Sequence, residues 1–414
     1  MFASLQHRDF RLLCVEIGLT NASRWMEFLV VGLVVLKLTN SPFWVGVIAA
    51  VRSWGWFLGP VGGVLADRFD RRKLIILVQA TNVLQAGVLL TLLALDRAGI
   101  GEILILAVVS SLVYAMEYPS RHALMVDLVG RESVPNAVAV SRMALDVTSI
   151  AGPFLAGTFM QLFSPAGGYA LVVAFYGVCL AAVVLIRPRP PLERGAGAWR
   201  ELRAGAGYIR RNQAAGSILF LALLANLLGF PFMFGLVPVF ARDILGVGPA
   251  LTGLLMAASG VGALMGSLTL ATLGNRGRDF RLMMVGFIVW GGLLALFALS
   301  RWYGLSVALL LVAWAGQSVA MSVGTSLLLT VVRPEMVGRV MGVRALMVIG
   351  LPIGSLLLGV GAERLGPSLA LALFGLALLG TVLAVGLLRP QLRRGLKVEH
   401  VTASPDLPLR HEQR

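Results

Sequence analysis

The chain contains twelve apolar stretches that are each long enough to cross a lipid bilayer. A spanning helix needs about 20 mostly apolar residues, because hydrocarbon offers no hydrogen-bond partners and the backbone groups must be satisfied within the segment. The stretches lie at residues 12–39, 43–66, 74–95, 101–120, 137–163, 168–187, 214–241, 250–273, 282–300, 303–332, 338–362 and 367–388. They predict an all-α integral membrane protein with twelve transmembrane helices.

The composition and the distribution of charge argue against a soluble protein. Hydrophobic residues make up 58% of the chain and charged residues 13%, against about 25% charged residues in soluble domains. A net charge of +15 would suit a nucleic-acid-binding protein if the basic residues formed one patch. They are instead concentrated in alternate connections between the apolar stretches. The other connections and adjoining helix ends hold only Lys37, Arg97, Arg242, Arg301 and Arg364.

This asymmetry predicts the orientation of the chain. Connections rich in lysine and arginine stay in the cytoplasm, and here they follow the even-numbered stretches, as at Arg68–Lys73. We therefore expect a multi-pass protein of the inner (plasma) membrane with both termini in the cytoplasm. The positive charge reflects topology, so no nucleic-acid partner is expected.

No pattern of residues indicates enzymatic or cofactor chemistry. The four histidines, at positions 7, 122, 400 and 411, fall in predicted loops or tails, and no G-x-x-x-x-G-K-[ST] sequence is present for ATP binding. Cys14 and Cys179 fall within predicted membrane helices, which suits neither a disulfide framework nor a metal site. We expect no enzymatic activity, no cofactor and no metal.

The chain divides into two halves of similar length. Residues 188–213 are rich in proline, glycine and arginine and predict a cytoplasmic linker. It separates an amino-terminal six-helix bundle, residues 1–187, from a carboxyl-terminal one, residues 214–390, and residues 391–414 predict a disordered cytoplasmic tail. An offset of 202 residues superposes Val129, Arg131, Val138, Arg142, Gly152 and Gly157 on Val331, Arg333, Val340, Arg344, Gly354 and Gly359. Such a repeat predicts pseudo-symmetric bundles with a substrate site between them.

A motif follows the second apolar stretch. Residues 63–73 read GVLADRFDRRK and resemble the major facilitator superfamily signature G-x-L-A-D-R-x-G-R-K, with Asp70 in place of a glycine. The resemblance implies the major facilitator fold and a conformational latch, in which Asp67 meets the start of the eleventh helix near Gly338. Gly63 would permit close helix packing, and Arg68, Arg71 and Arg72 would bind carboxylates or anionic lipid. A simple basic loop would explain the arginines alone.

The similarity extends over nearly the whole chain. Residues 118–157, together with HRDFRLL near the amino terminus and LTNSPFWVG after the first stretch, resemble the branch of the superfamily that includes the enterobactin exporter and related multidrug efflux proteins. The resemblance implies export of a small molecule. We expect the transporter to be a monomer. On the fifth helix, Gly152, Pro153 and Gly157 resemble part of the antiporter motif G-x-x-x-G-P-x-x-G-G. A generic packing kink explains these three residues equally well.

Ionisable residues inside membrane helices cost free energy to bury and therefore indicate function. The candidates for a functional role are Arg24, Glu27, Arg52, Arg142 and Asp146. Glu27 is the candidate proton-coupling residue, because burial favours its protonated form and a nearby arginine its ionised form. A permanent ion pair of Glu27 with Arg24 or Arg52 is the alternative. Arg142 and Asp146 are one turn apart and predict a gating pair.

The sequence thus predicts a secondary transporter, driven by protons, that exports apolar or amphipathic small molecules, drug-like or siderophore-like, by rocking of its halves. Its partners would be the substrate, protons and membrane lipids. An importer or lipid flippase of the same fold remains an alternative, as does a membrane receptor or scaffold that transports nothing.

Overall fold

The computed structural model describes residues 3–59, 62–63, 68–188, 198–274 and 279–388. Asp67, the expected tail at 391–414 and residues 189–197 of the expected linker lie outside the described residues. Most of the rest of that linker forms helix α8 (Ala198–Arg211). The regular elements of the described part are all helical.

The helices before and after the linker form two series. The first consists of α1 (Arg8–Thr39), α2 (Pro42–Phe57), α4 (Arg71–Ala94), α5 (Ile100–Val129), α6 (Val134–Leu162) and α7 (Pro165–Val184). The second consists of α9 (Gln213–Leu224), α10 (Val237–Val239), α11 (Pro249–Leu273), α12 (Phe280–Leu299), α13 (Tyr303–Val331), α14 (Val337–Leu346), α15 (Gly350–Leu365) and α16 (Pro367–Leu388). Within the described residues, eleven helical segments are long and apolar enough to cross a membrane. The expected span 43–66 begins as α2 and then runs into residues outside the described part. The predicted all-α membrane fold is confirmed.

Helix α5 is longer than the apolar pattern indicates. It continues nine residues beyond the expected end at residue 120, reaching Val129 with Pro119 inside the helix. Proline is tolerated in membrane helices, because neighbouring groups compensate the lost hydrogen bond. Arg121 directly follows the expected fourth span, 101–120, so it was expected in a cytoplasmic connection. That expectation was wrong, because Arg121 lies within the helix.

The seventh apolar stretch is a helix with irregular turns. After α9 come three π-helical segments, η3 (Ala225–Gly229), η4 (Phe232–Leu236) and η5 (Phe240–Ile244), with α10 between the last two. Pro231 and Pro238 each lack the N–H that a regular α-helix uses. Such π-helical turns are frequent at functional sites, and this stretch contributes side chains to the cavity described below.

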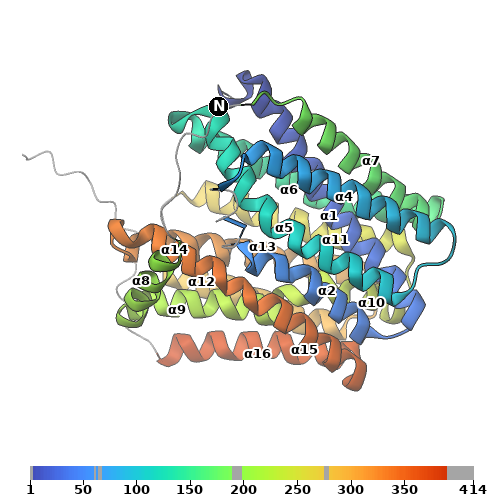
Figure 1. The fold of residues 1–414 in the computed structure, drawn as a ribbon. Helices are drawn as coiled ribbons and strands as arrows, with labels where there is room; N and C mark the ends of the chain where they lie inside the picture. Colours follow the sequence, from blue (N-terminus) through green and yellow to red (C-terminus); the bar gives the residue numbers. More distant parts are fainter. Residues whose placement is uncertain (1–2, 60–61, 64–67, 189–197, 275–278, 389–414) are drawn as a thin grey trace, which may run out of the picture.

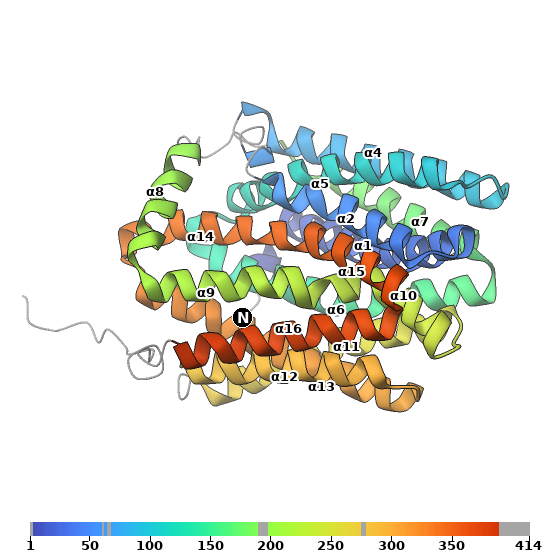
Figure 2. The same ribbon diagram turned by 90° about the horizontal axis from the view of Figure 1, so that it is seen from below.

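Each series of helices packs mainly within itself. Helix α1 packs on α6 and α7, and α4 packs on α5 and α7, while in the second series α12 packs on α13 and α16. Figures 1 and 2 show α4 and α16 on opposite sides of the molecule. The most extensive contacts between the series are those of α6 with α11 and of α2 with α15, and smaller ones join α1 and α2 to the seventh apolar stretch. The interface between the halves is therefore formed mainly by these four helices.

The halves are closed against each other at the end of the molecule that carries the α1–α2 connection. There the Arg242 side chain donates to the carbonyl oxygen of Leu36 (2.9 Å) and to Oδ1 of Asn40 (2.8 Å). The Ser41 hydroxyl donates to Oε2 of Glu363 (2.8 Å). We call this the closed end. At the other end, a Cβ added to Gly63 or Gly338 would have no neighbour within 4 Å, which shows open space around both.

Contact between glycines holds the closed end together. A Cβ on Gly46 of α2 would lie 2.7 Å from the carbonyl oxygen of Ser355 and 2.8 Å from Cα of Gly359, both on α15. We expect Gly46→Val to force α2 and α15 apart. Such overpacking costs about 1–3 kcal/mol, which would lower the population of the closed conformation by about 5-fold to 150-fold.

Thiol labelling checks this prediction. In a chain without Cys14 and Cys179, a cysteine at the buried Ala49 beside this contact should react slowly with a maleimide, and Gly46→Val should speed the reaction. Gly177→Val is the matched control, because a Cβ there meets nothing within 4 Å. Equal labelling rates in both variants would show that the glycine contact does not keep this end closed.

Candidate functional site

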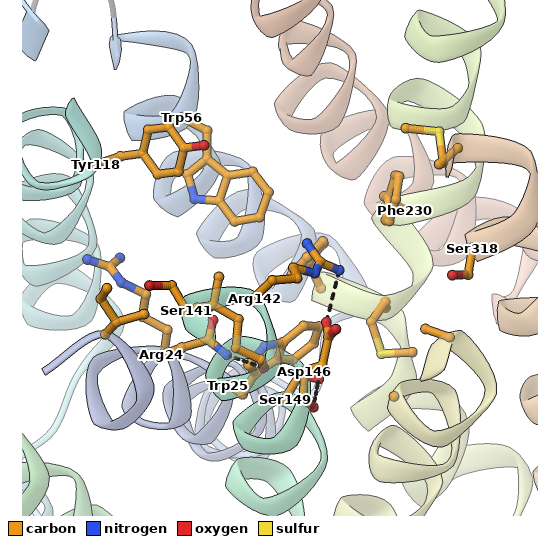
Figure 3. A pocket seen from close by; sticks show the side chains of 18 of the residues that line it. Arg24, Trp25, Trp56, Tyr118, Ser141, Arg142, Asp146, Ser149, Phe230 and Ser318 are labelled. Carbon is orange, nitrogen blue, oxygen red and sulfur yellow. Dashed lines mark hydrogen bonds and ion pairs between the residues drawn. The ribbon is translucent and has the colours of Figure 1, made fainter. Parts of the chain in front are cut away.

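A cavity of about 820 Å³ lies between the two halves. Helices α1, α2, α5 and α6 line it from the first half, and the η3–η4 region, α11, α13 and α14 from the second. Figure 3 shows Arg142 and Asp146 on the side of the first half, with Phe230 and Ser318 across the cavity from them. A space of this size, reached by both halves, can hold a drug-sized molecule.

Aromatic rings form one wall of the cavity. Phe234 of η4 stacks on Trp25 of α1, with ring centroids 5.4 Å apart. Its centroid also lies 4.8 Å from that of Phe28 and 5.5 Å from that of Trp56. A side chain of the second half thus inserts among three aromatic side chains of the first. This wall offers flat apolar faces to the body of a ligand.

Glu27 lies behind this wall and is paired with Arg52. A terminal nitrogen of Arg52 is 2.5 Å from Oε2 of Glu27. The hydroxyl of Tyr169 donates to Oε1 (2.7 Å), and that of Tyr176 donates to Oε2 (3.1 Å). The Glu27 side chain is 1% exposed. Of the two expected partners, Arg52 forms the pair and Arg24 does not.

Arg24 belongs to a second buried cluster. It pairs with Glu117, which also accepts a hydrogen bond from Arg121 (2.5 Å). Arg121 in turn binds both carboxylate oxygens of Glu16, at 2.6 and 2.9 Å. The ion pairs therefore form one chain, from Arg24 to Glu117, Arg121 and Glu16, which links α1 to α5. Both glutamates are fully buried.

Glu16 and its neighbours were not predicted from the sequence. Nε2 of Gln79 on α4 donates to Oε1 of Glu16 at 2.6 Å. Gln79, Asn82 and Gln85 form a chain of side-chain hydrogen bonds, and all three are buried. Three polar residues at i, i+3 spacing in an apolar stretch were the available signal, since that spacing places them on one face of a helix.

Arg142 and Asp146 of α6 face the cavity directly. A terminal nitrogen of Arg142 lies 2.9 Å from Oδ1 of Asp146, and the two side chains are 69% and 29% exposed (Figure 3). Such an exposed pair is held weakly. It can therefore exchange partners with a ligand or with the opposite half.

The residues of the expected latch are only partly described. Arg71 lies 2.7 Å from Oδ1 of Asp127, and Arg72 donates to the carbonyl oxygen of Val184 (2.7 Å), so both bind within the first half. Arg68 is exposed. With Asp67 outside the described residues, its contact near Gly338 stays a prediction.

The glycines of the fifth-helix motif permit close packing. A Cβ on Gly152 would lie 2.7 Å from the carbonyl oxygen of Ala22 on α1, and one on Gly157 would collide with the carbonyl oxygen of Pro249. Pro153 lies inside α6, which is continuous through it. These contacts position α6 between α1 and α11, and they account for both glycines as packing residues.

The chemistry available in the cavity is that of binding. Its lining combines aromatic rings, hydroxyl groups and guanidinium groups. Across the described ranges, no group of three histidine, cysteine, aspartate or glutamate side chains could hold a metal ion.

Comparison with known proteins identifies relatives along the whole chain. The model of the family described as transmembrane secretion effector (MFS_3) matches residues 1–408. The enterobactin exporter EntS of Escherichia coli O139:H28 (strain E24377A / ETEC) is 28% identical over 397 residues, which cover 94% of this chain and 93% of the exporter. EntS of Escherichia fergusonii matches to the same extent.

Solved structures share the fold at lower sequence identity. The nucleoside transporter NupG superposes with a TM-score of 0.74 at 13% identity, covering 91% of this chain and 98% of that one. A POT peptide transporter in complex with sulfate superposes with a TM-score of 0.75 at 12% identity, covering 94% and 95%. These similarities establish a transporter fold shared with both.

Proposed function

We propose that this chain, which belongs to the transmembrane secretion effector family of the major facilitator superfamily, is a proton-coupled exporter of small amphipathic molecules. That it is a multi-pass secondary transporter, and not an enzyme, follows from the family match and from its similarity to the enterobactin exporter. The name of that relative favours outward transport, and the apolar wall of the cavity favours a drug-like or siderophore-like cargo. The observation that carries the proposal is the cavity between two halves that are bound together at the closed end and have open space at Gly63 and Gly338 at the other.

The direction in which the cavity opens is compatible with export, although an alternating-access importer also passes through this state. The connections rich in arginine lie at the open end, and the positive-inside rule places such connections in the cytoplasm. In this orientation both termini are cytoplasmic, and the cavity receives its cargo from the cytoplasm. Rocking of residues 1–187 against residues 214–390 would then close the open end and part α2 from α15.

Glu27 is the proposed site of proton coupling. It lies behind the cavity wall, and its partner Arg52 lines the cavity. In an antiporter the ligand and the proton must exclude each other. A ligand that presses Arg52 against Glu27 would favour the ionised carboxylate and release its proton, and a proton taken up by Glu27 from the outside would weaken this pair and release the ligand. Arg24, Arg142 and Asp146 also line the cavity and would shift with the ligand.

The latch is a proposal for the conformation with the open end closed. Asp67 would then meet the amino-terminal end of the helix near Gly338, where the helix dipole favours a carboxylate. The open space at Gly63 and Gly338 leaves room for that approach. Arg68 would bind anionic lipid, while Arg71 and Arg72 stay bound within the first half.

Efflux from cells tests the proposal. Bacteria with the chain should retain less of an amphipathic fluorescent dye than bacteria without it, and a protonophore should abolish the difference. A dye panel with anionic, neutral and cationic members covers the range of cargo charge. Greater retention in cells with the chain would indicate import. Efflux that persists without a proton gradient would contradict proton coupling.

A further inference from the structure

We infer that the cavity takes an amphipathic molecule with an anionic group, and that Arg344 is the residue that binds this group. The inference rests on the proposed transport function and adds the charge of the substrate to it. Three observations carry it: the pairing of the arginines, the order of charges from the cavity inward, and the repeat between the halves.

The first observation is that one arginine of the cavity has no acidic partner. Five arginines line the cavity: Arg24, Arg52, Arg121, Arg142 and Arg344. The first four each form an ion pair. Arg344 of α14 has no carboxylate within ion-pair distance in the described ranges. It is half-buried, and closure of the halves would remove it further from water. An anionic group on the substrate would offset the cost of that burial.

The second observation is that arginines stand between the cavity and the acids. Glu16, Glu27 and Glu117 are at most 1% exposed, and none of them lines the cavity. The arginines that pair with them do. Asp146 is the one acid in the described lining, and Arg142 holds it. The guanidinium groups would therefore repel a cationic molecule, whereas they would donate hydrogen bonds to an anionic one.

The third observation is that the repeat has lost an acid in the second half. The offset of 202 residues places Arg142 on Arg344 and Asp146 on Val348. The first half thus contains a complete pair, and the second contains the arginine alone. Because the two arginines line one cavity from opposite halves, a ligand can reach the uncompensated charge of Arg344.

The aromatic wall defines the rest of the substrate. Trp25, Trp56 and Phe234 offer ring faces in the same cavity, which suit a planar apolar body. Tyr118 interacts electrostatically with Arg344, and the ring of His122 lies 4.4 Å from that of Tyr118. Both residues line the cavity and add a hydroxyl and an imidazole donor for an acidic group. A carboxylate or acidic phenol attached to an aromatic body has both features.

Three matched dansyl compounds test the charge of the substrate. Dansylglycine is anionic, its methyl ester is neutral and dansylethylenediamine is cationic, while the aromatic body is the same. Binding is measured by dansyl fluorescence on the purified full-length chain in lipid nanodiscs. We expect dansylglycine to bind about tenfold more tightly than the other two, the effect of one hydrogen-bonded charge. Arg344→Gln should remove that advantage and leave ester binding unchanged, and Arg344→Lys should keep most of it.

Arg142→Gln is the matched control, because Arg142 occupies the equivalent position with its acid present. It should weaken dansylglycine binding much less than Arg344→Gln does. Equal losses in the two variants would assign the preference to the overall charge of the cavity and overturn the role of Arg344. Tighter binding of the cation than of the anion would overturn the inference altogether. Binding in nanodiscs involves neither direction nor a proton gradient, so these results stand apart from the efflux test of export.

Discussion

Glu27→Gln is expected to abolish the proton movement that accompanies substrate transport. Glutamine keeps the size of the side chain and its contacts with Tyr169 and Tyr176, but it cannot take up or release a proton. A pH-sensitive dye inside proteoliposomes measures the effect. Substrate addition should change the internal pH with the parent chain, and the variant should give only the signal of protein-free liposomes.

A double variant separates coupling from stability. Glu27→Gln leaves Arg52 without its carboxylate, and breaking a buried ion pair costs about 3–5 kcal/mol. Glu27→Gln combined with Arg52→Gln removes both charges, so it should recover much of the stability while remaining uncoupled. If Glu27→Gln moved protons as the parent does, Glu27 would be a structural partner of Arg52, and Asp146 would be the next acid to test.

Arg121→Gln is expected to destabilise the fold strongly. Arg121 binds Glu16 and Glu117, and both carboxylates would be left with fewer donors in a fully buried place. Losing one member of such a cluster costs about 3–5 kcal/mol. We expect a large fall in the midpoint of thermal unfolding, followed by tryptophan fluorescence in detergent, and poor yield of folded protein.

The exposed pair on α6 is the control for this prediction. Arg142 and Asp146 also form an ion pair one turn apart, but Arg142 is 69% exposed, and such pairs contribute about 0–1 kcal/mol. Arg142→Gln should therefore leave the unfolding midpoint close to that of the parent. Similar midpoints for Arg121→Gln and Arg142→Gln would mean that the buried cluster does not stabilise the fold.

The sequence was sufficient for the fold but not for the length of every helix. Apolar stretches predict membrane helices because lipid excludes unsatisfied backbone groups. The end of α5 was not predicted, because its last turns contain charged residues, as a loop does, and Pro119 is typical of a helix end. The helical position of Arg121 was missed for the same reason, since a basic residue after an apolar stretch is typical of a cytoplasmic loop.

The sequence predicted several charged residues of the site, but it did not predict all of the ion pairs that they form with each other. Charges inside apolar stretches identify Arg24, Glu27 and Arg52 by their cost in lipid. Which partner each one finds depends on how closely α1, α2 and α5 approach. Contacts between residues far apart in the sequence set these distances, as at Gly55 of α2, where a Cβ would collide with the carbonyl oxygen of Ser111 on α5. Tyr169 and Tyr176 gave no signal, because a tyrosine in a membrane helix is usual whether or not its hydroxyl binds an acid.

Substrate uptake driven by an imposed pH gradient tests the central claim most directly. Proteoliposomes with an acidic interior would receive whichever dansyl compound binds most tightly, with protein-free liposomes as the baseline for passive distribution. Proton antiport predicts accumulation inside that exceeds this baseline, disappears with a protonophore and is absent at equal pH. Uptake that is the same with and without the gradient would contradict proton-coupled export.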